Sequence, residues 1–284
     1  MTLHTLDHTG THRGMRAAAT ALVALAAAGA LLAAGAAPAA ADDAKARDIM
    51  QKVIDRDDGD NETSRMEMVL IDKDGNRRTR KLEVYRKDRG PDTTMSLMFF
   101  LTPADVAGTG FLTYDYREQD DDQWLYLPSL RNVKRIASSD KSGSFMGSDL
   151  NYSDMSEPVL DDYDLTLLKE EEVDGHMTWR IESVPRTDAV AEETGYSKSV
   201  LWVRQDKHVL LRAVRFVNNS SRRKFMQANK VEQIDGIWVV TERQMVTRDG
   251  NVSLHGTLVK ISDVAFGQDL SEDMFTVRRL EKGP

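Results

Sequence analysis

The stretch that decides the fold is Lys198–Asn218, KSVLWVRQDKHVLLRAVRFVN. Runs rich in Val, Leu and aromatic residues lie on both sides of a polar turn at Gln205–His208. Trp202 shares a strand face with Val200, and Phe216 shares one with Val214. Two strand-like runs on either side of a short turn predict two antiparallel strands joined in a hairpin.

Strand-like patterns, several of them with alternating apolar and polar residues, recur along most of the chain. Met66 and Met68 share one face of RMEMVLID, and a second hairpin is expected around Asp235-Gly236. Thr94–Thr102 is apolar on both faces, which predicts a covered central strand. Roughly ten or more strands joined by short turns predict a mainly β chain, in which one large antiparallel sheet curls, closes or is covered.

Few segments depart from this pattern. Asp43–Arg56 has apolar residues at helical spacing and predicts an amphipathic helix, while short helical material is expected near Ser148–Met155. The polar stretch Arg186–Gly195 predicts an exposed loop. No repeat or linker interrupts residues 42–284, so we expect them to form a single domain.

The first 41 residues have the layout of a secretory signal peptide. Arg13 and Arg16 precede an apolar run over residues 17–37, and Ala39–Ala41 supply small residues before Asp42. We expect cleavage after Ala41, with an uncleaved membrane anchor as the alternative. The signal alone leaves both the periplasm and full secretion open.

Composition and motifs exclude several functions. The chain has a net charge of −8 and no Cys, so we expect no nucleic-acid partner, only transient membrane contact, and no disulfides. His176, His208 and His255 lie on separate strands or turns, which argues against a metal. No Gly-x-Ser-x-Gly elbow or phosphate loop occurs. We therefore expect no cofactor, no catalytic residue and no enzymatic activity.

The loop Ser139–Met155, SDKSGSFMGSDLNYSDM, is polar yet contains an apolar group. We interpret it as a lid, with Gly143 and Gly147 as hinges. The apolar plug would consist of Phe145, Met146, Leu150, Tyr152 and Met155. The alternative is a loop that holds Phe145 permanently in the core.

Methionine is frequent in the chain, and this flexible side chain suits surfaces that accept variable apolar partners. A sheet lined by Met, Leu and aromatic residues is a candidate lipid cavity. Besides the plug, its expected lining residues are Met66, Met68, Leu82, Phe99, Phe111, Trp124, Tyr126, Trp179, Trp202, Phe216 and Trp238.

Four long runs resemble a known family. They are DKDGNRRTRKLEVYRK, FFLTPADVAGTGFLTYDY, DDDQWLYLPSLRNVKRI and SSDKSGSFMGSDLNYSDM. Over residues 44–280 the chain resembles the outer membrane lipoprotein-sorting protein-like family, a branch of the LolA and LolB-like periplasmic lipoprotein carriers. The resemblance implies a half-open antiparallel barrel whose concave face binds acyl chains under an N-terminal helix and a loop lid. It also implies a periplasmic location and an inner-membrane exporter partner of the RND/MMPL type.

The resemblance also implies a ligand-binding arginine under the lid, and Arg135, Arg180 and Arg215 all remain candidates.

The sequence leaves three functions open. The first is a carrier that moves a lipid or lipidated protein toward the outer membrane. The second is an accessory or scaffold protein of the exporter, which predicts a filled barrel. The third is a hydrolase using acidic turns, which predicts two carboxylates converging in a pocket, one with a raised pKa.

Overall fold

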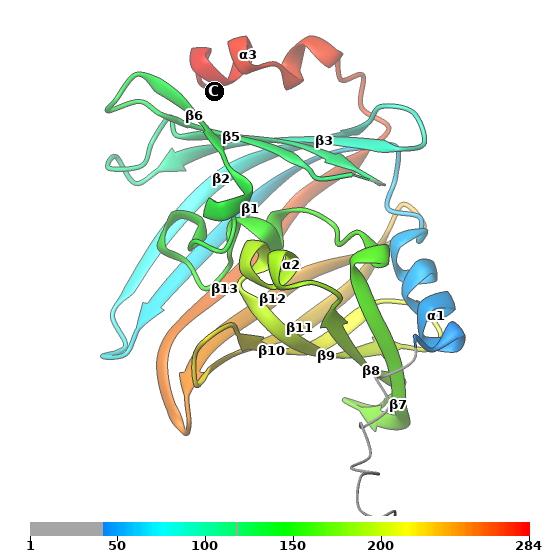
Figure 1. Cartoon of the computed structure of the whole chain (residues 1–284). Helices are drawn as coiled ribbons and strands as arrows, with labels where there is room; N and C mark the ends of the chain where they lie inside the picture. Colours follow the sequence, from blue (N-terminus) through cyan, green and yellow to red (C-terminus); the bar gives the residue numbers. More distant parts are fainter. Residues whose placement is uncertain (1–41, 118) are drawn as a thin grey trace, which may run out of the picture. The chain divides into compact units, whose positions relative to one another are not determined.

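The computed structural model describes residues 42–117 and 119–284, in which β-strands predominate (Figure 1). The expected signal peptide lies outside the described residues. The strands are β1 (Asn61–Asp72), β2 (Arg77–Asp88), β3 (Thr93–Thr102), β4 (Gly110–Tyr116), β5 (Asp122–Leu127), β6 (Asn132–Ile136), β7 (Tyr163–Val173), β8 (His176–Pro185), β9 (Tyr196–Arg204), β10 (Leu210–Val217), β11 (Arg222–Ile234), β12 (Ile237–Asp249) and β13 (Val252–Phe266).

All of these strands belong to one antiparallel sheet of 13 strands, in the order β6-β5-β4-β3-β2-β1-β13-β12-β11-β10-β9-β8-β7. Strands adjacent in sequence pair with each other in two meanders, β1–β6 and β7–β13, and the pairing of β1 with β13 joins them. β6 and β7 are the two edges and do not pair with one another, so the sheet is open. The prediction of a mainly β chain built on one large antiparallel sheet is confirmed.

The helices are few and short. The α-helices of the described residues are α1 (Ala44–Ile54), α2 (Asp188–Thr194) and α3 (Val277–Lys282). The 3-10 helices are η1 (Ser138–Asp140), η2 (Phe145–Gly147), η3 (Tyr152–Met155), η4 (Leu160–Asp162) and η5 (Glu272–Phe275). Within the described ranges, no helix combines the length and apolar composition needed to cross a membrane.

Local chemistry explains where α1 and α2 begin. The Asp43 carboxylate accepts hydrogen bonds from the backbone N–H groups of Lys45 and Ala46, and so caps α1. The expected loop at Arg186–Gly195 is instead largely helical. Thr187 caps α2, and Gly195 ends it in the left-handed conformation with φ 78°.

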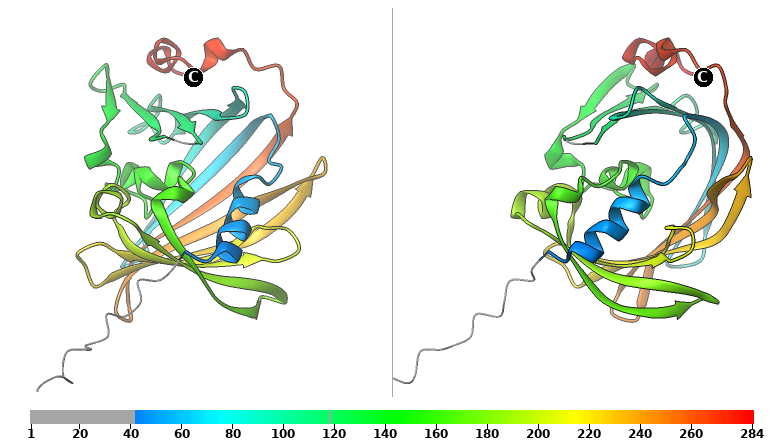
Figure 2. Two further views of the ribbon diagram at one scale, coloured as in Figure 1. Left: turned by 45° about the vertical axis from the view of Figure 1, so that its right-hand side comes forward. Right: turned by 90° about the vertical axis from the view of Figure 1, so that its right-hand side faces the viewer.

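Both faces of the sheet are covered in part. The first face, which carries Met68 and Phe111, packs against residues 139–155 in one region, and against α1 beside β7–β10 in another. The second face, which carries Phe99 and Leu112 in β3 and β4, packs against Phe275 and the rest of the C-terminal segment. Figure 2 shows α1 and the C-terminal segment on opposite sides of the sheet.

Candidate ligand-binding site

Residues 139–155, here called the covering segment, lie on the first face of the sheet. Phe145 is fully buried, and its ring centroid lies 5.0 Å from that of Phe111, 5.6 Å from that of Tyr152 and 6.1 Å from that of Phe100. Met146, Leu150 and the neighbouring apolar residues of the segment join the same cluster. The covering segment therefore packs on the aromatic residues Phe100 and Phe111 of this face.

The backbone of the covering segment bonds mainly to itself. The N–H of Phe145 donates to the carbonyl of Leu150 at 2.7 Å, and the N–H of Tyr152 donates to the carbonyl of Gly143 at 3.0 Å. Met146 and Gly147 have φ values of 50° and 75°, in the left-handed region that favours glycine. The segment is thus a folded loop that adds no strand to the sheet.

Polar side chains attach this loop to the sheet. The Asp149 carboxylate accepts a hydrogen bond from the Thr257 hydroxyl at 2.7 Å and lies 2.7 Å from His255 Nδ1. Lys224 Nζ donates to the Asp149 carbonyl and to Asn151 Oδ1, both at 2.6 Å. The Thr247 hydroxyl on β12 also donates to the Asp149 carboxylate, so the contacts of Asp149 come from β11, β12 and β13, on the second meander.

Three ion pairs complete the attachment. Arg215 on β10 lies 2.8 Å from Asp154, and the Tyr196 hydroxyl donates to the same carboxylate at 2.7 Å. Lys141, only 2% exposed, pairs with Asp121 and, at 2.6 Å, with Glu193. Lys141 thereby links the loop before β5 to α2, so the covering segment connects both meanders.

The expected lining residues divide into groups. Those on the first face, in contact with the covering segment or within it, are Met66, Met68, Leu82, Phe111, Phe145, Met146, Leu150, Tyr152 and Met155. Trp179 lies on the same face, in the cluster around α1.

Three expected lining residues lie on the second face instead. Phe99, Trp124 and Tyr126 pack in the cluster formed with the C-terminal segment. Alternation in β3 sends Phe100 toward the covering segment and Phe99 away from it. These three residues therefore stand apart from the site around Phe145.

The remaining aromatic residues contact cations. Trp202 and Phe216 alternate with residues of the first face, and lie under Arg180 and Arg223 with guanidinium-to-centroid distances of 5.2 and 4.8 Å. The Trp238 ring lies 4.4 Å from Lys207 Nζ. None of these three residues joins a cluster around the covering segment.

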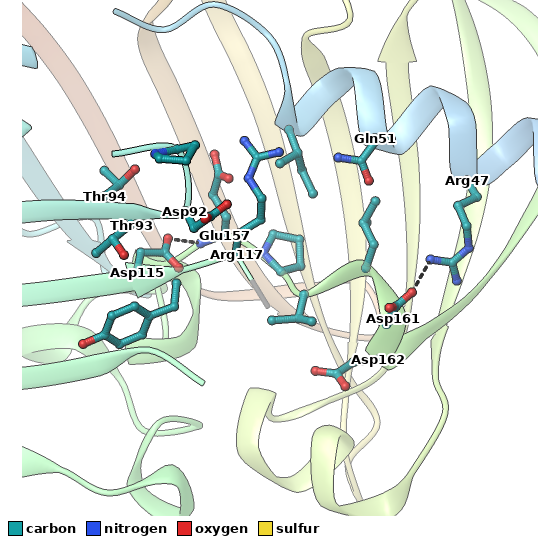
Figure 3. Close-up of a pocket in the computed structure, with 16 residues that line it drawn as sticks. Arg47, Gln51, Asp92, Thr93, Thr94, Asp115, Arg117, Glu157, Asp161 and Asp162 are labelled. Carbon is teal, nitrogen blue, oxygen red and sulfur yellow. Dashed lines mark hydrogen bonds and ion pairs between the residues drawn. The ribbon is translucent and has the colours of Figure 1, made fainter. Parts of the chain in front are cut away.

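The cavities beneath the covering segment and α1 are small. They have volumes of about 80 and 70 Å³, compared with roughly 300–1,000 Å³ for typical ligand sites. A larger cavity of about 760 Å³ opens beside α1, and its walls are rich in carboxylates (Figure 3). The apolar face is therefore filled in this structure, whereas the open space is polar.

Two carboxylates line that larger cavity. Burial raises the pKa of Asp115 to about 7, and burial also raises the pKa of Glu157. The Glu157 N–H donates to the Asp115 carboxylate at 2.7 Å (Figure 3). Asp115 thus changes charge near neutral pH.

We expect Asp115→Asn to stabilise the protein at pH 8 by about 1–3 kcal/mol. A pKa raised from 3.8 to about 7 means that the native state binds the proton more tightly than the unfolded state. Stability contributed by this group is therefore greatest at low pH and is lost as pH rises toward 7. Urea denaturation at pH 5 and pH 8 measures the difference, which should shrink at pH 5. Asp161→Asn, in the same cavity but 89% exposed, is the control and should change stability by under about 0.5 kcal/mol at both pH values.

Solved structures with a similar fold identify the family of this chain. A domain from Vibrio parahaemolyticus, named for outer membrane lipoprotein sorting, is 30% identical over 84% of this chain and 98% of its own, with a TM-score of 0.76. A family model described as "Uncharacterized protein" matches residues 92–282. The chain belongs to the outer membrane lipoprotein-sorting protein-like family.

Two further structures resemble this lipoprotein-sorting-like chain. A DUF1329 family protein from Desulfovibrio piger is 32% identical over 84% of this chain and 99% of its own, with a TM-score of 0.75. A LolA superfamily protein from Nitrosomonas europaea shares the fold at 22% identity, over 82% and 98% of the two chains, with a TM-score of 0.62. No curated protein matches the chain.

The three candidate arginines of this lipoprotein-sorting-like chain differ in position. Arg135 is exposed and pairs with Asp122, and Arg180 stacks on Trp202. Arg215 instead lines the small cavities beneath the covering segment and α1. A further arginine, Arg80 on β2, donates a hydrogen bond to the carbonyl of Met146 in the covering segment.

Sequence reasoning missed the charged residues beneath the covering segment. Lys224 and Arg243 each lie two residues before a methionine that packs on the first face, Met226 and Met245 respectively. A cation two residues from an apolar residue of a strand shares its face, so it interrupts the apolar side of the alternation. This interruption of the apolar side was the sequence signal that could have identified Lys224 and Arg243.

Proposed function

We propose that this protein is a periplasmic carrier that binds a lipid or lipidated protein on the first face of its sheet. In this proposal the sheet acts as a half-open barrel, and the covering segment is its lid in the closed position. The lid would lift around Gly143 and Gly147. An exporter of the RND/MMPL type in the inner membrane would supply the cargo, which moves toward the outer membrane.

One observation carries the proposal. Phe145 is fully buried against Phe100 and Phe111, yet it belongs to a loop whose backbone-to-backbone hydrogen bonds, in the described residues, stay within residues 137–155. Side-chain contacts alone attach such a loop to the sheet, so it can detach as a unit without breaking a strand ladder. Lifting it would expose a continuous apolar surface that carries Met66, Met68 and the two phenylalanines.

The free energy gained by burying an acyl chain can offset the loss of the contacts that the plug residues make. Transfer of each CH2 group from water contributes about 0.8 kcal/mol. The opposing terms are the broken lid contacts and the lost freedom of the ligand. A long chain therefore gains enough to displace Phe145 and Met146, while a partner that holds the lid open favours release.

A reversible lock tests the carrier function. The chain has no Cys, and the Asp149 backbone and side chain both contact the Thr257 hydroxyl, at 2.9 and 2.7 Å. We expect oxidised Asp149→Cys plus Thr257→Cys to lose exchange of a fluorescent fatty acid and of an acylated peptide, and reduction to restore it. Each single variant, treated with the same oxidant, is the control. Equal exchange by the oxidised and reduced double variant contradicts the lid.

The scaffold function is the second candidate, because the cavities of the apolar interior reach only about 80 Å³. A protein that docks on an exporter without cargo needs no more space. It predicts that wild-type and reduced double-variant proteins bind neither the fatty acid nor the acylated peptide.

The hydrolase function is favoured by one feature, the pair Asp115 and Glu157 with raised pKa values in the larger cavity. It predicts hydrolysis of a glycan or lipid ester that disappears in Asp115→Asn. The carrier predicts unchanged fatty acid exchange in that variant.

A further inference from the structure

Arg243 on β12 lacks a partner. Its side chain makes no hydrogen bond and no ion pair with any residue between 42 and 284 that the structure describes, and its Nε is buried without an acceptor. An unsatisfied buried donor costs roughly 1–3 kcal/mol, and more when it is charged. A ligand that supplies the missing acceptor would remove this cost.

Arg243 lines the cavity of about 80 Å³ together with Arg215. The Arg215 Nε is also buried without an acceptor, although Arg215 Nη1 lies 2.8 Å from Asp154 Oδ1. The rest of the wall includes Leu150 and Asp154 from the covering segment, and Met226 and Met245 from the sheet. Two guanidinium groups and one carboxylate therefore line a space whose other walls are largely apolar.

The nearby carboxylates leave one of these positive charges uncompensated. Asp154 pairs with Arg215, while Asp149 is engaged by Thr257 and His255. Lys224, opposite Arg215 on β11, adds a further ammonium group that bonds to the covering segment. Burial lowers the pKa of Arg243, which is the direction expected when an anion is missing.

We propose that Arg243 and Arg215 bind the carboxylate of a single-chain fatty acid, whose tail lies along the first face of the sheet. This inference rests on the proposed carrier function and specifies its ligand. Guanidinium groups bind a carboxylate through two parallel hydrogen bonds, which would satisfy the orphaned donors. The carboxylate end of the ligand would lie inside, so the site favours a free fatty acid over an acyl chain that is joined to a peptide.

A comparison of an acid with its neutral ester tests this site. The delipidated chain without residues 1–41 is titrated calorimetrically at pH 8 with dodecanoate and with methyl dodecanoate. We expect the wild type to bind the acid about 10–100-fold more tightly than the ester, as for a charged hydrogen bond. Arg243→Met should lose that preference and keep its affinity for the ester, which also shows that the variant is folded.

Two further variants sharpen the result. Arg212→Met, which removes an arginine that pairs with Asp174, should keep the preference for the acid. Arg243→Lys should retain part of it, because the charge remains but the planar fork is lost. If Arg243→Met does not fold, Arg243→Lys alone must lower the preference.

Other outcomes overturn the inference. Equal affinity of the wild type for acid and ester removes the carboxylate site but leaves the carrier function intact. If Arg243→Met still binds the acid more tightly than the ester, Arg243 does not bind the carboxylate and water alone solvates it. Binding of neither compound, nor of the acylated peptide, contradicts the carrier function itself.

Discussion

Lys141→Met is expected to lower the free energy of unfolding by about 3–5 kcal/mol, as for a buried ion pair that loses one partner. The Lys141 side chain is 2% exposed and lies between Asp121 and Glu193. The methionine fills a similar volume but leaves two carboxylates facing each other without a cation. Because Glu193 is 25% exposed, water reaches one of them, and the lower end of this range is expected. Urea denaturation at pH 7 measures the change.

Lys134→Met is the matched control for Lys141→Met. Lys134 also pairs with an aspartate, Asp140, but the two side chains are 61% and 45% exposed. Exposed pairs contribute little, so the change should stay below about 0.5 kcal/mol. Equal losses in the two variants would contradict the role given to Lys141 as the link between the meanders.

Phe145→Ala is expected to accelerate hydrogen exchange in the covering segment by roughly 10²–10³-fold. Truncating a buried phenylalanine costs about 3–5 kcal/mol, and here the cost falls on closure of the segment. The amides of Phe145 and Tyr152, which close the loop on itself, report this opening. Amides of the central strands should keep their exchange rates, because the sheet does not depend on the closed segment.

Phe275→Ala is the control for Phe145→Ala. Phe275 is of the same size and also fully buried, but it packs on the second face of the sheet. It should lower global stability without selectively exposing the covering segment. If Phe145→Ala instead accelerates the sheet amides together with those of the segment, Phe145 is a permanent part of the core and not a plug.

The strand pattern was predictable because a half-buried strand must alternate. Met66, Met68 and Leu70 on β1 follow directly from a period of two, and the hairpin between β9 and β10 follows from two apolar runs that flank a polar turn. Gly75, with φ 83°, lies in the turn between β1 and β2. These features depend on neighbours in sequence, so local chemistry determines them.

The assignment of residues to faces was less predictable. Alternation places Phe99 opposite Phe100, but it does not say which of the two meets the covering segment. The answer depends on Phe275 and Leu280, which fold over the second face from the far end of the chain. Likewise the Arg186–Gly195 stretch was polar enough to suggest a loop, and its caps at Thr187 and Gly195 were overlooked.

The covering segment has one feature that the sequence predicted and one that it did not. Its apolar group among glycines and serines was visible in the sequence and led to Phe145. Its attachment was not, because Asp149 and Asp154 are engaged by side chains from β9, β10 and β13, many residues away. Buried polar contacts of this kind follow from the tertiary structure and not from local pattern.

The most direct measurement is native mass spectrometry of the wild-type chain without residues 1–41, purified without detergent from the periplasm of a Gram-negative host. The carrier account predicts a mass excess equal to one lipid per chain, and organic extraction should release that lipid and return the bare mass. A bare mass on purification, unchanged after incubation with fatty acid, phospholipid and acylated peptide, would contradict it.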